Sequence, residues 1–215
     1  MATNLWTNRE HALDYLRRAD KIPHRTEGEA MLLDLIPAGI TRFLDLGSGN
    51  GRLLMLVRAE HPAANAVAVD FSPAMLEALR GKFAGDPSTV IIEHNLENRL
   101  PELGKFDAVV SSFAIHHLPD ARKRTLYEEV YGLLASGGIF YNLEHVSSPT
   151  PELHEVFLHH LEVRRNEEDP SNILLDVETQ LQWLREIGFV NVDCHWKWLE
   201  LALIGGQKRQ GGLSA

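Results

Sequence analysis

The chain has 215 residues, of which 44% are hydrophobic and 24% are charged, and its formal net charge is −9. These values are typical of one globular α/β domain and exclude disordered and collagen-like chains. The negative charge argues against binding nucleic acid through the general surface, because phosphate contacts need clustered Lys and Arg side chains. The apolar runs are far shorter than the ~20 residues that span a bilayer, so we predict no membrane span. The single cysteine, Cys194, excludes an internal disulfide and favours a cytoplasmic location.

The first part of the chain contains two predicted helices. Apolar residues recur at helical spacing over residues 9–20 and 26–36, and a proline break separates the two segments. Thr26 followed three residues later by Glu29 predicts a capping box at the start of the second helix. Because both helices precede the first predicted strand, we expect residues 1–36 to form a helical lid over the functional site.

Short strands and helices alternate in the middle of the chain. Nearly continuous apolar runs between helical patterns predict a parallel sheet that is covered on both faces. Ser72-Pro73 predicts a helix start, and Gly137-Gly138 predicts a helix end. The predicted strands are residues 42–46, 66–69, 90–92, 107–111 and 139–143, and the predicted helices are residues 51–60, 72–84 and 120–135.

The last third of the chain has a different pattern. We predict a helix over residues 151–165 and another over 176–187, the second closed by a glycine. Two strand-like runs, 189–195 and 198–204, are close enough in sequence to pair as a hairpin at the sheet edge. Residues 206–215 are rich in glycine and polar side chains, and they predict a flexible tail.

A glycine-rich loop joins the first predicted strand to the helix after it. Residues 44–52 read LDLGSGNGR, with Gly47, Ser48 and Gly49 at the centre. Glycines at this position form a tight turn that lets the backbone approach a ligand closely. The G-x-G-x-G spacing differs from the G-x-G-x-x-G of dinucleotide-binding proteins and argues against an NAD-dependent oxidoreductase. The alternative is a strand-to-helix turn without a ligand.

Polar side chains follow the second and third predicted strands. Asp70 ends the second strand, where a carboxylate can accept hydrogen bonds from both hydroxyls of a ribose, and Phe71 can stack on an adenine. The alternative role of Asp70 is to cap the helix that starts after Ser72. Asn95 and Leu96 follow the third strand, where Asn95 can accept from an exocyclic amine and Leu96 can cover the ring edge.

The fourth predicted strand ends in serines and continues into a turn with two histidines. Ser112, His116 and His117 lie there beside the topological switch point, where open parallel sheets bind ligands. Histidine is suited to acid–base chemistry because its pKa is near neutrality, so His116 and His117 are candidate catalytic residues. The alternative is that one of them packs or caps the turn. The histidines of residues 151–165 lack the spacing of metal ligands, so no metal site is predicted.

The segments LDLGSGNG, AVAVDFSPAML, FDAVVSSFAIHHL and LLASGGIFY, in this order, resemble the class I S-adenosylmethionine (SAM)-dependent methyltransferases. The resemblance implies a three-layer Rossmann-like α/β sandwich with a seven-stranded, mostly parallel sheet and one antiparallel strand near the C-terminus. It also implies SAM as the methyl donor. One domain over residues 1–205 is expected, made of the lid 1–36, a SAM-binding core 42–145, a helical segment 151–187 and a hairpin 189–204.

The resemblance also implies roles for individual residues. The glycine loop would back the methionine part of SAM, Asp70 would hold the ribose hydroxyls, and Ser112 would face the amino-acid end. Asn95 stands where many relatives have Asp, which changes the polarity of the adenine contact. The SAM-binding residues implied in the core are Gly47, Ser48, Gly49, Asp70, Phe71, Asn95, Leu96 and Ser112.

Both ends of the chain are more distantly similar to the carboxymethyluridine-forming, tRNA wobble-modifying members. The similarity rests on IPHRT before the first strand, and on DVET, GF, Trp196 and Trp198 near the end. In that branch the residue at the position of Arg25 reaches the donor, so Arg25 is expected to pair with the methionine carboxylate of SAM. The alternative is that Arg25 is a solvated charge beside a helix start.

These observations predict an enzyme that transfers a methyl group from SAM to a small-molecule acceptor by direct displacement. A sulfonium methyl is already activated, so the protein mainly has to align donor and acceptor and exclude water. Two alternatives stay open: a tRNA wobble-uridine modifying enzyme that uses SAM or a carboxylated derivative, and a noncatalytic SAM-binding regulatory protein. The sequence identifies neither the acceptor nor the oligomeric state.

Overall fold

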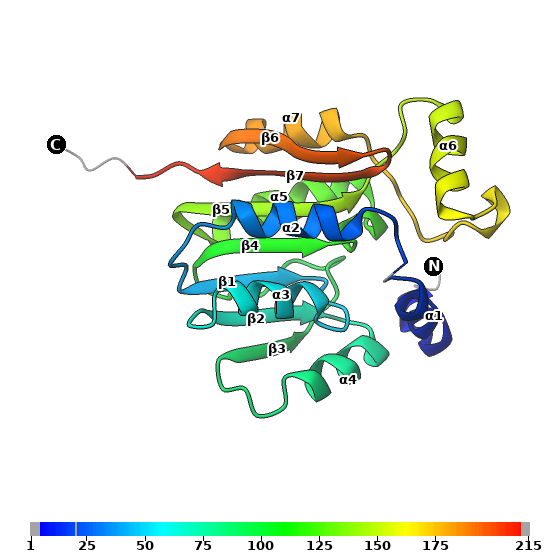
Figure 1. Ribbon diagram of the computed structural model, residues 1–215. Coiled ribbons are helices and arrows are strands. Elements are labelled where there is room, and N and C mark those ends of the chain that lie inside the picture. The colour runs from blue at the N-terminus through cyan, green and yellow to red at the C-terminus, as the bar shows by residue number, and fades with distance from the viewer. Residues whose placement is uncertain (1–4, 20, 212–215) are drawn as a thin grey trace.

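Seven strands form one sheet in the computed structural model, which describes residues 5–19 and 21–211 (Figure 1). The strand order is β3-β2-β1-β4-β5-β7-β6, and β7 is antiparallel to both of its neighbours while the other pairs are parallel. The predicted fold class is confirmed. The strands are β1 Arg42–Leu46, β2 Asn65–Asp70, β3 Thr89–Glu93, β4 Phe106–Ser112, β5 Leu134–His145, β6 Phe189–Trp198 and β7 Leu201–Lys208.

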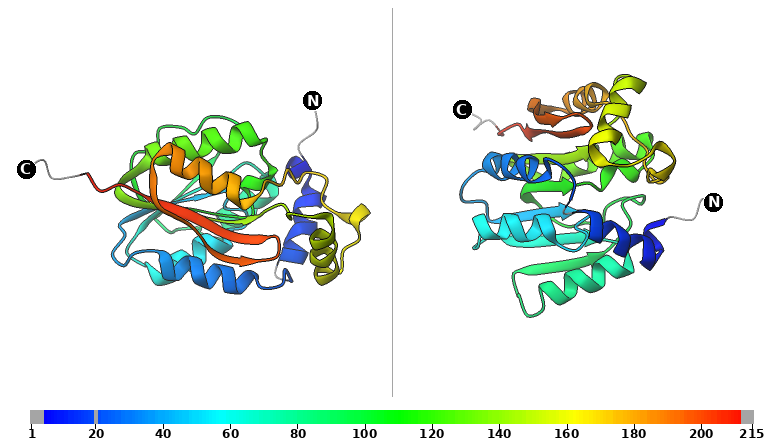
Figure 2. Two further views of the ribbon diagram at one scale, coloured as in Figure 1. Left: turned by 90° about the horizontal axis from the view of Figure 1, so that it is seen from above. Right: turned by 45° about the vertical axis from the view of Figure 1, so that its right-hand side comes forward.

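Helices cover both faces of the sheet. α2 and α3 lie on one face, and α5 and α7 lie on the other (Figure 2). Short 3-10 helices are η1 Leu5–Thr7, η2 Ile115–His117 and η3 Arg165–Glu167. The α-helices are α1 Arg9–Ala19, α2 Arg25–Leu35, α3 Arg52–Glu60, α4 Pro73–Lys82, α5 Asp120–Leu133, α6 Pro151–Leu161 and α7 Val177–Ile187.

The apolar strands are explained by this double cover. Successive strand residues point to opposite faces, so Phe43 of β1 packs in the core with Leu32 of α2, and Leu44 packs in the core with Leu126 of α5. All four side chains are fully buried. Each additional buried side chain of this size stabilises the fold by about 1.5–3 kcal/mol, and a strand buried on both faces reads as a continuous apolar run.

Helix α2 begins differently from the prediction. Its N-cap is His24, which adopts the left-handed conformation (φ 58°) and makes no side-chain capping bond. The predicted capping box of Thr26 and Glu29 is therefore wrong. The buried Glu29 carboxylate instead accepts hydrogen bonds from Arg25 and Arg52. The partners of this carboxylate are thus the arginine side chains of α2 and α3, and not a backbone N–H at the start of α2 as the capping box predicted.

The glycine pair before the fifth strand does not end a helix. α5 ends at Leu133 and β5 begins at Leu134, so Gly137 and Gly138 lie inside β5, and the predicted helix end is wrong. A Cβ at Gly138 would lie 3.0 Å from the Phe106 carbonyl oxygen. The glycine permits close approach of β5 to β4 at the point where their register shifts.

The end of the chain contributes more to the sheet than predicted. β7 continues to Lys208, so the predicted flexible tail over residues 206–215 is wrong for residues 206–208, which pair with β5 or β6. A Cβ at Gly205 would lie 2.2 Å from the Phe140 carbonyl oxygen, so the strand needs glycine there. Glycine at the end of β7 permits close packing of the strands, whereas we predicted from the sequence that it makes this segment flexible. The last four residues of the prediction lie outside the described residues.

The first two helices occupy different places. α2 packs on the sheet, since a Cβ at Gly28 would lie 2.8 Å from Leu143 and 2.9 Å from Trp196. α1 lies at one end of the sheet, where Ala12 packs with Met75 of α4 (Figure 1). The predicted lid over residues 1–36 therefore extends too far, because α2 is part of the helical layer. A lid made by the segment before α2 stays a prediction.

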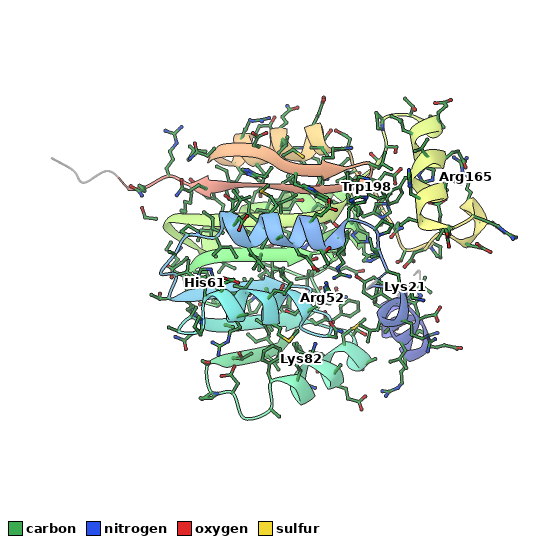
Figure 3. The ribbon with its side chains drawn as sticks, viewed as in Figure 1. Lys21, Arg52, His61, Lys82, Arg165 and Trp198 are labelled. Atoms are coloured by element: carbon green, nitrogen blue, oxygen red, sulfur yellow. The ribbon has the colours of Figure 1, made fainter. Side chains whose placement is uncertain are left out.

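Aromatic side chains join the hairpin to the helices at this end of the sheet. The ring of Trp198 on β6 lies 4.4 Å from the ring of His24 and 6.0 Å from that of Phe157 on α6 (Figure 3). α6 is also shorter than the predicted 151–165, because Glu162 adopts a left-handed conformation (φ 55°) that ends the helix. The chain then continues as a loop toward α7.

Candidate functional site

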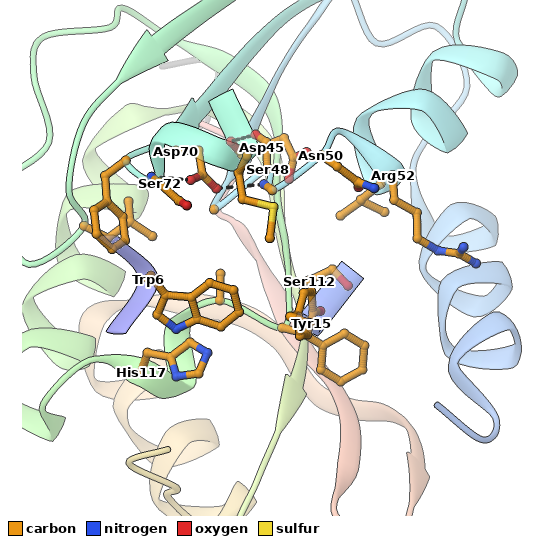
Figure 4. Close-up of a pocket in the computed structure, with 18 of the residues that line it drawn as sticks. Trp6, Tyr15, Asp45, Ser48, Asn50, Arg52, Asp70, Ser72, Ser112 and His117 are labelled. Atoms are coloured by element: carbon orange, nitrogen blue, oxygen red, sulfur yellow. Dashed lines mark hydrogen bonds between the residues drawn. The ribbon is translucent and has the colours of Figure 1, made fainter. Parts of the chain in front are cut away.

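A pocket lies at the C-terminal ends of β1, β2 and β4, where the strand order reverses. In Figure 4 the glycine loop and the end of β2 lie on one side, and Trp6 and His117 lie across from them. The structure brings together every residue that the sequence predicts to bind SAM, and their individual contacts with a ligand stay predictions. These lining residues are Arg25, Gly47, Ser48, Gly49, Asp70, Phe71, Asn95, Leu96 and Ser112.

The glycine loop after β1 has no room for a side chain at Gly47 but open space at Gly49. Gly47 has φ 68°, and a Cβ there would lie 2.2 Å from the Cβ of Ala114. Gly49 has φ 54°, but the nearest atom to a Cβ there is Met75 Sδ at 3.9 Å. A side chain at Gly49 would therefore occupy the pocket itself. This loop can bring its backbone against a ligand only because both positions are glycine.

Asp70 fixes the loop to the end of β2. Its Oδ2 accepts a hydrogen bond from the Gly49 N–H (2.8 Å), and its Oδ1 accepts one from the Ser72 N–H (2.9 Å). Asp70 thus binds the backbone of Ser72, the N-cap residue of α4, without capping the helix itself, and it also lines the pocket. Burial raises the pKa of its carboxyl above the usual range.

Asp45 on β1 is the least satisfied polar side chain of the pocket wall. It is 1% exposed, lines the pocket, and neither carboxylate oxygen has a hydrogen-bond partner among the described residues. Burial raises the pKa of its carboxyl to about 7. A buried carboxylate without a partner is costly, so a cationic group in the pocket would relieve it. The sequence shows Asp45 two positions before Gly47, but did not lead us to predict it as a site residue.

The three serines that line the pocket, Ser48, Ser72 and Ser112, differ in their availability for a ligand. The Ser48 hydroxyl donates to the Asp45 carbonyl oxygen (2.9 Å) and accepts from the Val69 N–H (3.1 Å), so it holds the loop in place. The Ser112 hydroxyl at the end of β4 is buried and has no hydrogen-bond partner among the described residues. The Ser72 hydroxyl has no partner among the described residues either, so Ser72 and Ser112 both have bonding capacity left for a ligand.

Residues 43–138 match the family described as methyltransferase domain. The glycine loop, Asp70, Asn95 and Ser112 all lie inside the matched stretch. The match identifies this stretch, which is just under half of the chain, as a methyltransferase domain. The predicted superfamily is thereby confirmed, whereas the tRNA wobble-modifying branch stays a prediction.

Proteins with related sequences are also methyltransferases. An uncharacterised methyltransferase of Mycobacterium tuberculosis is 33% identical over 131 residues, which make up 61% of this chain and 62% of that protein. Trans-aconitate 2-methyltransferase of Methylobacterium radiotolerans is 34% identical over 116 residues, which make up 54% of this chain and 42% of that protein. The chain thus spans less than two thirds of the length of these relatives.

A solved structure shows the same fold with the donor bound. Human N-acetylserotonin methyltransferase in complex with SAM superposes with a TM-score of 0.68 at 16% sequence identity, over 96% of this chain and 58% of that chain. The similarity to this complex shows the fold, and the match to a methyltransferase domain supports SAM as the cofactor. The pocket fits such a donor, because Asp45 offers an unpartnered carboxylate and Gly49 leaves open space.

Two arginines from different helices meet at the wall of the methyltransferase pocket. Arg25 Nε donates to Glu29 Oε1 (2.8 Å), and Arg52 donates to both Glu29 oxygens, from Nε (2.7 Å) and from a terminal nitrogen (2.8 Å). Arg25 is 6% exposed and lies over the Phe113 ring at 5.0 Å. The alternative of a solvated surface charge is thereby wrong. Arg25 and Arg52 line the pocket and Glu29 lies behind them.

The side chains expected at the adenine end lie on two loops. Asn95 Oδ1 accepts a hydrogen bond from the Glu97 N–H (2.9 Å), so this oxygen is engaged within its own turn. Leu96 is 6% exposed, and Phe71 lines the same pocket from the end of β2. The Asn95 Nδ2 group can thus still donate hydrogen bonds to a ligand. This agrees with the change of polarity expected where Asn stands in place of Asp.

The two candidate catalytic histidines have different surroundings. His116 is 5% exposed, does not line the pocket, and its Nδ1 lies 2.6 Å from Glu144 Oε1. Burial lowers the pKa of His116 well below its ordinary value. His117 lines the pocket, and its ring stacks on that of His116 at a centroid distance of 3.9 Å. Only His117 can therefore reach a bound molecule without a change in structure.

The side of the pocket that faces the glycine loop is aromatic. Trp6 of η1, and Tyr15 and Leu16 of α1, line it, and we call these three residues the roof. The Trp6 ring lies 5.1 Å from that of Tyr15 and 5.0 Å from that of His117. Trp6 was not predicted as a site residue, because an isolated tryptophan before a helix has no periodicity that indicates a ligand site.

The described part of the chain contains no group of three or more His, Cys, Asp or Glu side chains that could hold a metal ion. None of its helices is long and apolar enough to cross a membrane. The predicted cytoplasmic location stays a prediction.

Proposed function

We propose that the chain is a SAM-dependent methyltransferase that transfers a methyl group to a small-molecule acceptor. The observation that carries the proposal is the buried, unpartnered Asp45 carboxylate beside the open space at Gly49. SAM is a cation with an α-ammonium group, and a carboxylate in a low-dielectric wall favours such a group strongly. Donor binding would thus satisfy a group that the protein alone leaves without a partner.

The other lining residues support the same orientation of the donor. Arg25 suits the methionine carboxylate, because guanidinium groups bind carboxylates with strong charge-assisted hydrogen bonds. Asp70 suits the ribose, since its carboxylate lines the pocket at the end of β2. When bound, SAM supplies an activated methyl group, and the protein has to orient the acceptor and exclude water from the pocket.

A small acceptor is favoured by the surroundings of the pocket and by one relative. The roof covers the side opposite the glycine loop, so a large substrate surface has little access there. The net charge of −9 disfavours an RNA acceptor. The name of trans-aconitate 2-methyltransferase, one of the relatives, states a small-molecule acceptor.

Titration calorimetry with S-adenosylhomocysteine (SAH), the product form of the donor, tests the proposal. We expect saturable binding of one SAH molecule per chain. We also expect slow transfer of the labelled methyl group from SAM to an added acceptor. Binding without transfer to any acceptor would favour the noncatalytic alternative. Absence of SAH binding by the folded protein would contradict the proposal altogether.

A further inference from the structure

His117 is held by a loop that is distant in sequence. Its Nδ1 lies 3.0 Å from the Ser171 hydroxyl and 3.2 Å from the Ser171 carbonyl oxygen. The Ser171 hydroxyl in turn donates to Asp169 Oδ1 (2.7 Å). Asp169, Ser171 and His117 thus form a chain of hydrogen bonds that ends at the pocket wall.

The bonding capacity of Ser171 determines the tautomer of His117. A hydroxyl has one proton, and Ser171 gives it to Asp169, so Ser171 can only accept from His117. The Ser171 carbonyl oxygen can also only accept. His117 Nδ1 must therefore carry a proton, and in the neutral ring Nε2 carries a lone pair. No hydrogen bond to Nε2 is made by the described residues.

Apolar and aromatic side chains line the pocket together with His117. The ring of the roof residue Trp6 lies 5.0 Å from the His117 ring at a tilt of 58°, and Tyr15 of α1 contacts Trp6 of η1. Leu16 and Leu118 complete this part of the lining. An aromatic ring fits between such walls, because ring contacts add about 0.5–1.5 kcal/mol to the burial of its surface.

We infer that the acceptor is a neutral aromatic hydroxyl compound and that His117 Nε2 takes its proton during methyl transfer. The inference deepens the proposed methyltransferase function and rests on it. Asp169 and Ser171 are positioning residues, since they act through the tautomer of His117. His116 and Glu144 lie behind His117 and do not touch the acceptor.

The step balances in atoms and charge. A lone pair of the acceptor oxygen forms the new O–C bond, the C–S bond of the donor breaks, and its electron pair stays on sulfur. The hydroxyl proton moves to His117 Nε2. One positive charge is therefore transferred from the sulfonium to the imidazolium, so the net charge of the pocket does not change. A second cation never has to form beside the sulfonium.

The charged and titratable surroundings of His117 agree with a neutral ring before the reaction. His116 of η2, Glu144 of β5 and Asp169 of the loop before α7 face it, and His11 of α1 lies 3.4 Å from Asp169. Burial, and next the neighbouring His116, lower the pKa of His117 to about 3. A weak base suffices, because the hydroxyl becomes strongly acidic as the O–C bond forms.

The test uses His117→Asn, because the Asn Nδ2 can still donate to Ser171 while the Nε2 lone pair is lost. The exposed His159 on α6 does not line the pocket, so His159→Asn is the matched control. Labelled SAM is incubated with equal concentrations of substituted phenols, aliphatic alcohols, carboxylic acids and primary amines. SAH binding and thermal unfolding are measured for each variant.

We expect the wild type and His159→Asn to methylate phenols only. His117→Asn should bind SAH within about threefold of wild type and lose about 10²–10³-fold in rate at pH 7, the scale of general-base catalysis. Its residual rate should rise about tenfold per pH unit between pH 7 and 9, because only the phenolate, with a pKa near 10, can then react. The wild-type rate should be nearly constant over this range.

Other results would overturn the inference. An unchanged rate in folded His117→Asn, or a loss that is equal at every pH, contradicts the proton transfer. Methylation of another class, or of no phenol, by a wild type that binds SAH contradicts the acceptor class and leaves the donor site intact. Failure to bind SAH contradicts the proposed function itself.

A readout without turnover tests the positioning residues. In the ¹⁵N NMR spectrum of histidine-labelled protein, wild-type His117 should show a protonated Nδ1 and an unprotonated Nε2 at pH 7. Asp169→Ala removes the side-chain acceptor of the Ser171 hydroxyl, which can then donate its proton to Nδ1, so the Nε2-protonated tautomer should gain population. An unchanged tautomer in Asp169→Ala, or a wild type already protonated at Nε2, overturns the assignment of these roles.

Discussion

The donor wall of the pocket and its roof are built in different ways. The donor wall, which consists of Asp45, Gly47, Gly49, Asp70 and Ser112, comes from strand ends and the loop after β1. The roof comes from two successive helices, η1 and α1, before the sheet begins. Backbone geometry fixes the donor wall, whereas side-chain packing fixes the roof. Donor binding should therefore tolerate few substitutions, and acceptor choice should vary with the roof and the loop at Ser171.

Among the substitutions that test this difference, one in the glycine loop should have the largest effect on donor affinity. Gly49→Val should reduce SAH affinity more than about hundredfold, because the side chain fills the pocket and strains a backbone at φ 54°. Gly39→Val is the control, since Gly39 has φ 80° with no atom within 4 Å of a Cβ. Calorimetry should show loss of binding in the first variant alone. Normal binding by folded Gly49→Val would show that the loop does not hold the donor.

Asp70 tests whether one donor-wall side chain acts on the ligand directly. Asp70→Ala should weaken SAH binding by about 1.5–3 kcal/mol, the scale of hydrogen bonds to a charged group. Adenosine binding should fall by a similar factor, because the ribose is common to both ligands. Unchanged affinity for both would leave Asp70 with its structural bonds to Gly49 and Ser72 only.

Asp45 makes donor affinity depend on pH. Its folded pKa of about 7 lies above its ordinary 3.8, so the stability that it contributes is present below about pH 4 and is lost as the pH rises through 7. An α-ammonium group binds the ionised form. SAH affinity should thus increase about tenfold per pH unit below pH 7 and level off above it.

The control for Asp45 is a ligand that lacks the amino group. Affinity for 5′-methylthioadenosine should not increase with pH over this range, and Asp45→Asn should remove the pH dependence for SAH. A parallel increase for both ligands in calorimetry between pH 5.5 and 8 would assign the effect to another group.

Substitution of Arg25 should have the smallest effect on donor affinity, because Arg52 still lines the same wall of the pocket. Arg25→Ala should weaken SAH about fivefold to tenfold, somewhat below the full range for a charged hydrogen bond. Decarboxylated SAM should bind wild type and Arg25→Ala equally. Equal losses for the two ligands in a competition assay would mean that Arg25 supports the pocket without touching the carboxylate.

The donor wall was largely predictable because its signals are local. Gly47, Gly49 and Asp70 lie at the ends of strands that the apolar runs identify, and parallel strands place those ends together. The sequence shows Asp45 at this position, but it does not show that the carboxylate lacks hydrogen-bond partners, because burial and hydrogen bonding depend on the whole fold.

The roof and the support of His117 were not predictable, because they depend on distant contacts. Trp6 meets His117 across more than a hundred residues, and Ser171 meets it across a loop without a regular pattern. The predictions for Gly137, Gly138 and Gly206 were wrong for a related reason. In sequence, glycine that permits close strand packing looks the same as glycine that ends a helix or loosens a tail.

A crystal structure with SAH tests most directly the central claim that donor wall and roof enclose one reaction site. The account predicts the SAH amino group beside Asp45, the ribose hydroxyls at Asp70, and the sulfur turned toward the roof and His117. A sulfur that faces away from His117, or SAH bound outside this pocket, would contradict it.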